Sequence, residues 1–332
     1  MPVNDLENQF RTNLDDIATE LIQAFGLKYS NEVDGVHDPL LRWIDFSMRY
    51  IPQKERVVYF SKDFWNRLPK HLRKLVNIFS DHFEYGRNIN PYQSKGLIKF
   101  NDTSGNNPAK RTDLLWADWG IHHFHLTEQT PATGDYFSPR SEWLLFTIVG
   151  DDFVGFIDVR NHEEEDLFSD TDLLKHVVDS WPEIMEQYRL KGFDSVQTHN
   201  SAKDIALLRK AGISNMVSIS GNTYCGPGMG ITTARTATRS TMIRINIIRN
   251  LRAIVKSISD PNSSFQKDST NPCYSLKLSP KGLIIYNSTD DSGMIFPLRS
   301  LTSSNNAYTE ISEIISPHWV IDFMNSKYQL PL

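Results

Sequence analysis

"GIHHFHL" at residues 120–126 and "EWLLFTIVGDDFVGFIDVR" at residues 142–160 decide the fold that the sequence predicts. The first stretch is short and bounded by a glycine, and the second contains two apolar runs rich in aromatic and β-branched residues, a composition typical of strands. The turn Gly150-Asp151-Asp152 separates the two runs. We therefore expect three strands, of which the last two form a tight hairpin.

The remaining sequence is mainly helical in pattern. Helices are expected over 5–25, 62–80 and 236–258, and a further one carries "DLLKHVVDSWPEIMEQYRL" (172–190). Breaks are expected at Pro69 and Pro182. The stretch 273–298, "CYSLKLSPKGLIIYNSTDDSGMIFPL", predicts a small antiparallel sheet. The predicted fold class is α+β: an antiparallel central sheet flanked by helices, with a helical basic C-terminal half and a small terminal β-sheet.

Composition divides the chain into five segments in sequence order. Gly, Asn, Pro and Ser cluster between two patterned regions and indicate a linker, with a short strand expected at "GLIKF" (96–100). The predicted organisation is an N-terminal helical region, a linker, a central antiparallel-sheet unit, a basic helical region and a small β-rich tail, at 1–84, 85–112, 113–200, 201–260 and 261–332.

Bulk properties point to a cytoplasmic protein. No segment approaches the eighteen or so apolar residues that a membrane span requires, and the amino terminus lacks the pattern of a signal peptide. The two cysteines, Cys225 and Cys273, fit a reducing compartment. We expect no membrane association and no cofactor.

The histidines of the first strand are the candidate site. On a strand, alternate side chains share a face, so His123 and His125 point the same way, opposite to Phe124. Arg160 and His162 share a face at the end of the third strand, and Arg140 precedes the second.

Three interpretations of these residues stay open. Histidines at i and i+2 on a strand can bind zinc, although no H-E-x-x-H or paired C-x-x-C accompanies them; we expect no metal. Two imidazoles with arginines also suit metal-free cleavage of a phosphodiester, in which one group takes a 2′-hydroxyl proton and another protonates the leaving oxygen. The third interpretation is structural, with inert hydrogen-bonded histidines.

The order of "LLWADWGIHHFHL" and "EWLLFTIVGDDFVGFIDVRNH" resembles the core of RelE-type toxins, within the class of small metal-independent ribonucleases related to barnase. The resemblance covers residues 113–162. It implies helices leading into an antiparallel sheet, a first strand with basic residues at i and i+2, and a last strand that ends in basic residues. His123 and His125 stand where that family places arginines, and Arg160 and His162 stand at the end of the last strand.

The chain departs from the family pattern in its middle strand. The usual arginine falls near Trp143, so the resemblance leaves Arg140, in the preceding loop, as the nearest cation. Histidines in place of arginines shift the expected chemistry towards proton transfer.

A second candidate site is a basic segment. The net charge is −5, yet no acidic residue lies between Asp204 and Asp260. A helix over 236–258 places Arg244 on its apolar side, where it needs a partner. If the helix begins by Arg235, its opposite face gathers five cations. These are the predicted contacts to a nucleic-acid backbone: Arg235, Arg239, Arg249, Arg252 and Lys256. The preceding "GPGMG" (226–230) is either a polyanion-contacting loop or a plain connector.

These patterns favour an endoribonuclease-like enzyme whose catalytic residues are His123, His125, Arg140, Arg160 and His162. Its expected partners are nucleic acid, with RNA favoured over DNA, and an inhibitor or antitoxin protein. The resemblance places such an enzyme among bacterial toxins or phage-defence effectors. The alternatives are a non-catalytic nucleic-acid-binding protein that uses the basic helix, and a regulatory module that binds another protein.

Overall fold

The structure is a computed structural model that describes residues 3–30, 36–192, 201–263, 265, 272–298 and 305–328. Its contacts divide the chain into two compact units. Unit 1 comprises Met1–Met48, Thr103–Asn106 and Ser240–Leu332, and unit 2 comprises Arg49–Asp102 and Asn107–Arg239. Because each unit is assembled from separated stretches, the units do not coincide with the five predicted segments. The segment 1–84, for example, contributes to both.

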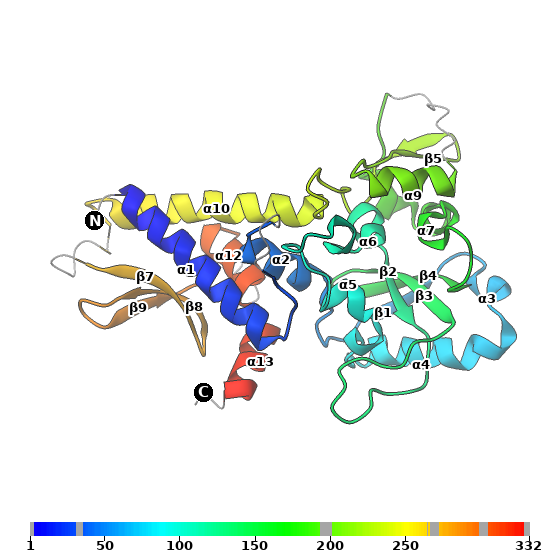
Figure 1. Ribbon diagram of the computed structural model, residues 1–332, viewed down its shortest axis with the longest axis horizontal. Coiled ribbons are helices and arrows are strands. Elements are labelled where there is room, and N and C mark those ends of the chain that lie inside the picture. The colour runs from blue at the N-terminus through cyan, green and yellow to red at the C-terminus, as the bar shows by residue number, and fades with distance from the viewer. Residues whose placement is uncertain are drawn as a thin grey trace. The chain divides into compact units, whose positions relative to one another are not determined.

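The α+β class is confirmed, but the central sheet is mixed. Unit 2 contains a four-stranded sheet in the order β1-β4-β3-β2, formed by Val57–Phe60, Phe153–Asn161, Trp143–Val149 and His122–His125 (Figure 1). The predicted strands β2, β3 and β4 pair antiparallel, as expected. The prediction of a purely antiparallel sheet is wrong, because β1, from the N-terminal region, pairs parallel with β4.

Helices cover both faces of this sheet (Figure 1). Helix α4 (Arg73–Glu84) packs Phe79 and Phe83 against Phe124 and Phe156 on one face. Helix α7 (Asp172–Ser180) belongs to the core on the other face, which contains Phe146. Since neighbouring residues of β3 belong to opposite cores, the strand is buried on both sides, which explains its continuous apolar run.

A buried ion pair joins distant parts of unit 2. Helix α6 (Leu114–Trp119) carries Asp118, and helix α9 (Ala202–Lys210) carries Arg209. Arg209 Nε lies 2.8 Å from Asp118 Oδ2, with 3% and 1% of the two side chains exposed. The Arg209 guanidinium also lies 4.1 Å from the centre of the Trp119 ring and donates to the carbonyl of Phe168. The pair therefore fixes α9 against α6 and against the 3-10 turn η4 (Leu167–Ser169).

The other elements of unit 2 are short. Pro69 separates α3 from α4 and Pro182 separates α7 from α8, as predicted. The strand expected at 96–100 is wrong, since Lys95–Ile98 forms helix α5. The remaining elements are α3 (Phe64–Arg67), α8 (Pro182–Glu186), β5 (Val217–Ile219), β6 (Asn222–Tyr224) and the 3-10 turns η1 (Lys70–Leu72), η2 (Asn90–Tyr92) and η3 (Pro108–Lys110).

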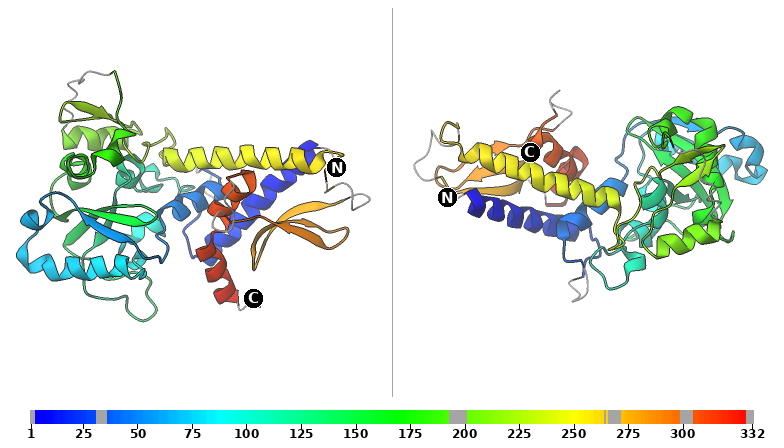
Figure 2. Two further views of the ribbon diagram at one scale, coloured as in Figure 1. Left: turned by 180° about the vertical axis from the view of Figure 1, so that it is seen from behind. Right: turned by 90° about the horizontal axis from the view of Figure 1, so that it is seen from above.

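Unit 1 combines helices with the predicted small antiparallel sheet. Helix α1 (Val3–Ala24) buries an apolar stripe that includes Phe10 and Leu14, and its Asn13 accepts a hydrogen bond from Leu276 N at 3.0 Å. The sheet has the order β7-β8-β9 (Figure 2). Its strands and the other helices are β7 (Tyr274–Ser279), β8 (Gly282–Asn287), β9 (Ser292–Ile295), α2 (Pro39–Arg49), α10 (Thr238–Ser259), α12 (Ala307–Ile315) and α13 (His318–Tyr328).

The ion pair of α6 and α9 gives a stability prediction. Arg209→Met leaves the buried Asp118 carboxylate without its counter-charge, and we expect the free energy of unfolding to fall by about 3–5 kcal/mol in urea titrations. The double variant Asp118→Leu/Arg209→Met removes both charges and should recover most of that loss. Lys175→Ala, which breaks an exposed i,i+4 pair with Asp179, is the control and should leave stability nearly unchanged. A full-sized loss in the double variant would contradict the assignment.

Candidate active site

Strand β2 places its histidines as the alternation predicted. Helix α6 ends at Gly120, whose φ of 70° reverses the chain into the strand. Across the sheet His123 pairs with Phe146 and His125 with Leu144, while Phe124 belongs to the opposite core. The shared face of His123 and His125 is not solvated, because α7 and η4 pack over it. Each of the two residues is only 6% exposed.

His123 lies in an aromatic cage with one carboxylate. Its ring centre is 5.2 Å from that of Phe168 and 6.1 Å from that of Phe146. Its Nδ1 atom lies 3.8 Å from Asp113 Oδ2, a charge-pair separation rather than a hydrogen bond. Burial lowers the pKa of His123, and the Asp113 carboxylate opposes that shift. Because burial is the larger effect, the pKa of His123 lies below its usual value and the imidazole is neutral at pH 7.

Asp113 is a site residue that the sequence reasoning missed. Its Oδ1 accepts the N–H groups of Leu115 and Trp116 at 3.0 and 3.2 Å and so caps α6, while Oδ2 faces His123. An Asp directly before the apolar run "LLWADW" is an N-cap signal, which could have identified the residue. Phe168 lies just beyond an acidic run, and no sequence signal placed it over the histidines.

His125 and His162 form a stacked pair. Their ring centres are 6.1 Å apart and their planes differ by 15°. His125 Nδ1 lies 3.4 Å from the carbonyl oxygen of Ser141 and 3.3 Å from Ser141 N, so either tautomer finds a backbone partner there. The tautomer that donates to the carbonyl leaves the lone pair of Nε2 free. Burial is the main cause that lowers the pKa of His125 to about 4; the charges of His123, His162 and Arg140 act in the same direction and the hydrogen bond with Ser141 opposes them. The imidazole is therefore neutral at pH 7. His162, by contrast, is exposed.

The two candidate arginines occupy different settings. Arg160 is held by Glu164 at 2.6 Å, by Asp170 at 3.1 Å and by Asp158 at 3.7 Å. A phosphate at Arg160 would have to displace one of these carboxylates. Arg140 is exposed in the loop before β3, and its charge reaches His125. Of the two candidate arginines, Arg140 is therefore the accessible one.

The predicted basic face is formed in part. Arg235 lies in a left-handed turn (φ 57°) before α10, so its expected place on the helix is wrong. Arg244 on the apolar side pairs with Asp38, the kind of partner that was expected. The other predicted cations lie on α10 and are exposed: Arg239, Arg249, Arg252 and Lys256.

The glycine loop packs on the end of α6. The N–H groups of Gly228 and Gly230 donate to the carbonyls of Asp118 and Ala117 at 3.0 and 2.9 Å. A Cβ at Gly228 would lie 2.3 Å from the carbonyl oxygen of Trp116, so only glycine fits this approach. These backbone donors close the last turn of a helix and are not free to bind an anion.

Two further features of the structure bear on the site. Among the described residues, no group of three or more His, Cys, Asp and Glu side chains could hold a metal ion. In the same part of the chain, every helix is too short or too polar to cross a bilayer.

Comparison with protein-family models, with curated proteins and with solved structures finds no match to this chain. Any functional assignment therefore depends on the fold and on the site. They define an α+β protein in which a buried and an exposed imidazole stack at one end of a mixed sheet.

The buried histidines make unit 2 sensitive to acid. Burial lowers the pKa of His122 to about 3 and that of His125 to about 4, below the value of 6.5 in an unfolded chain. Below pH 6.5 the unfolded state binds protons that the folded state refuses, so stability falls as the pH drops from 6.5 to about 4. Each group contributes a slope of at most about 1.4 kcal/mol per pH unit.

Urea titrations between pH 5.5 and 4.5 test this dependence. His122→Gln should reduce the slope by up to about 1.4 kcal/mol per pH unit, and His125→Gln should act similarly. His37→Gln, at an exposed histidine, should leave the slope unchanged. Equal slopes in all four proteins would show that the buried imidazoles are protonated in the folded state.

Proposed function

We propose that this protein is an endoribonuclease that cleaves RNA without a metal ion. The observation that supports it most is the stacked pair of His125 and His162, 6.1 Å apart, with the exposed Arg140 close enough to influence it. Metal-independent cleavage of RNA needs one group that accepts a proton, a second that donates one, and a cation for the phosphate. We infer that these three residues supply those groups.

The reaction divides between the two imidazoles. The neutral His125 takes the proton of a 2′-hydroxyl, whose oxygen attacks the adjacent phosphorus. His162 acts as the acid and gives a proton to the departing 5′-oxygen, so the products are a 2′,3′-cyclic phosphate and a free 5′-hydroxyl. Arg140 stabilises the charge that develops on the phosphate oxygens. Since His162 and Arg140 are exposed and His125 lies behind them, RNA approaches from their side.

His123 and Arg160 have supporting parts in this scheme. His123 is enclosed by Phe146 and Phe168 and lies close enough to His125 to lower its pKa. Arg160, bound by carboxylates of the segment that follows β4, orders the chain next to His162. Both residues act through their neighbours rather than on the substrate.

The proposal includes the expected surroundings of such an enzyme. RNA is the substrate, and an inhibitor or antitoxin protein that covers His162 and Arg140 would block access. The two free cysteines fit a place in the cytoplasm. A role as a toxin or a phage-defence effector follows from the resemblance of residues 113–162 to RelE-type toxins.

A non-catalytic nucleic-acid-binding protein is the second candidate. The burial of His123 and His125 favours it, because inert histidines are commonly enclosed in this way. In that case the exposed cations of α10 would bind the backbone and the histidines would only support the fold.

Cleavage of a labelled RNA in EDTA separates the two candidates. We expect His162→Ala to lower kcat/KM by about 10²-fold or more, the usual scale for an acid–base group. Because the His162 side chain is exposed, its replacement by alanine should leave the fold intact. His125→Ala should act similarly, and its rate should be compared at equal folded fraction. His37→Ala is the matched control. Full activity of the His162→Ala protein would exclude the mechanism.

A further inference from the structure

A groove in unit 1 combines cations from two helices. It lies between the first turns of α1 and the last turns of α10, which are neighbours at the N-terminal end of the unit (Figures 1 and 2). Its volume is about 440 Å³, within the range of ligand sites in proteins. We name it the α1–α10 groove; its polar lining consists of Asn4, Glu7, Asn8, Arg11, Arg252 and Lys256.

The charge of the groove is positive. Arg11, Arg252 and Lys256 contribute three positive charges and Glu7 one negative charge, which leaves +2. Arg252 Nε lies 3.2 Å from both Glu7 oxygens, and Arg11 donates to Oε1 at 2.6 Å. The carboxylate thus holds two guanidinium groups in the same groove. The Arg252 side chain is 53% exposed, so its remaining N–H donors are available for a ligand, whereas Arg11 Nε is buried.

The neighbouring face of α10 extends the positive charge. Arg249 precedes Arg252 and Lys256 by three and seven residues, which places the three cations on one side of the helix. Arg249 is exposed and makes no ion pair within the described part of the chain. Asn4 and Asn8, one turn apart on α1, add amide donors of the kind that contact phosphate oxygens.

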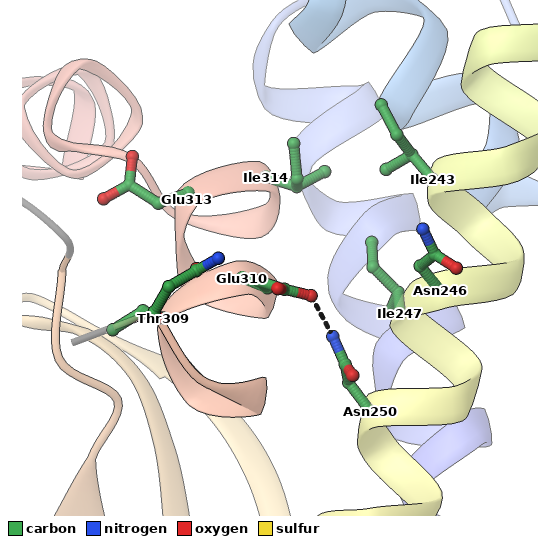
Figure 3. A pocket seen from close by; sticks show the side chains of 9 residues that line it. Ile243, Asn246, Ile247, Asn250, Thr309, Glu310, Glu313 and Ile314 are labelled. Atoms are coloured by element: carbon green, nitrogen blue, oxygen red, sulfur yellow. Dashed lines mark hydrogen bonds between the residues drawn. The ribbon is translucent and has the colours of Figure 1, made fainter.

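A second hollow on α10 has the opposite character (Figure 3). It lies between α10 and α12, has a volume of about 220 Å³ and is lined by Glu310 and Glu313, of which Glu310 points towards α10. Glu310 accepts a hydrogen bond from Asn250 at 2.6 Å. This acidic hollow repels a polyanion, so the two sides of α10 direct a nucleic acid to the α1–α10 groove.

We propose that the α1–α10 groove binds the phosphodiester backbone of single-stranded RNA and anchors the substrate of the histidine pair. Repeated phosphates suit a line of cations that continues from the groove to Arg249. Flexible single strands fit a groove of this size better than a rigid duplex. The choice of RNA as the ligand rests on the proposed function, whereas the groove itself rests on its own residues.

Fluorescence anisotropy with a labelled twelve-nucleotide oligouridine tests the site. The full chain carries His162→Ala in every sample, so that the RNA is not cleaved. We expect Arg252→Gln/Lys256→Gln to weaken binding by about tenfold at 50 mM salt. The slope of log K against log[salt] should decrease by about 1.4, because two phosphate contacts of about 0.7 each are lost. Lys277→Gln/Lys281→Gln removes equal charge from the terminal sheet of the same unit and is the matched control.

A variant that makes the groove more positive should have the opposite effect on RNA affinity. Glu7→Gln keeps an oxygen that can accept from Arg252 and removes the only negative charge of the groove. RNA affinity should therefore rise several-fold, a result that a purely structural Arg252–Glu7 pair would not give. Unchanged or weaker binding by Glu7→Gln would contradict the proposal.

Cleavage assays with the wild-type His162 distinguish failure of the groove from failure of the enzyme. The groove variants should raise KM for the twelve-nucleotide RNA but leave cleavage of a dinucleotide, whose single phosphate can occupy only one of the two sites, unchanged. If the protein binds RNA through the groove but never cleaves it, the groove stands and the endoribonuclease proposal fails. If RNA does not bind at low salt, or if both double variants weaken binding equally, the groove proposal is overturned.

Discussion

The buried ion pair between Arg209 and Asp118 is the constraint on which the candidate site depends. The two residues are 91 positions apart in the chain, and their charges meet where water is excluded. Burying such a pair is costly, and hydrogen bonds to its remaining polar atoms offset part of that cost. Asp118 Oδ1 and Arg209 Nη2 have no hydrogen-bond partner among the described residues. Arg209 Nη1 donates to the carbonyl of Phe168, and this contact holds η4 over the sheet. The Phe168 ring then packs on His123 and His162, at 5.2 and 6.0 Å.

This cover has two chemical consequences. It lowers the pKa of the enclosed imidazoles, so that His125 is neutral at pH 7 but is a weaker base than a free imidazole. It also restricts access to the edge where His162 and Arg140 are exposed. A site of this kind selects ligands that bring a proton donor to a buried base. Most of the free energy of binding must then come from contacts with other surfaces of the protein. The α1–α10 groove is the surface in unit 1 that suits a polyanion.

Local patterns predicted the local structure well. Helical spacing identified α1 and α10, two prolines marked real helix breaks, and alternation placed His123 and His125 on one face. Long-range pairing was beyond these patterns. The strand β1 joins β4 across more than ninety residues, and hydrophobic periodicity carries no information about a strand's partner. For the same reason the sequence did not predict the discontinuous units. It also did not predict the partners of Arg160, because the acidic residues near Arg160 in sequence indicated only a solvated loop.

The central claim is that RNA meets the protein at the His125–His162 pair. The most direct measurement is the imidazole NMR spectrum in EDTA while a 2′-deoxy-substituted, uncleavable RNA dinucleotide is added. The account predicts that the signals of His162 and His125 shift together in a saturable manner, while those of the exposed His37 stay in place. RNA binding that leaves both paired imidazoles unperturbed would contradict the account.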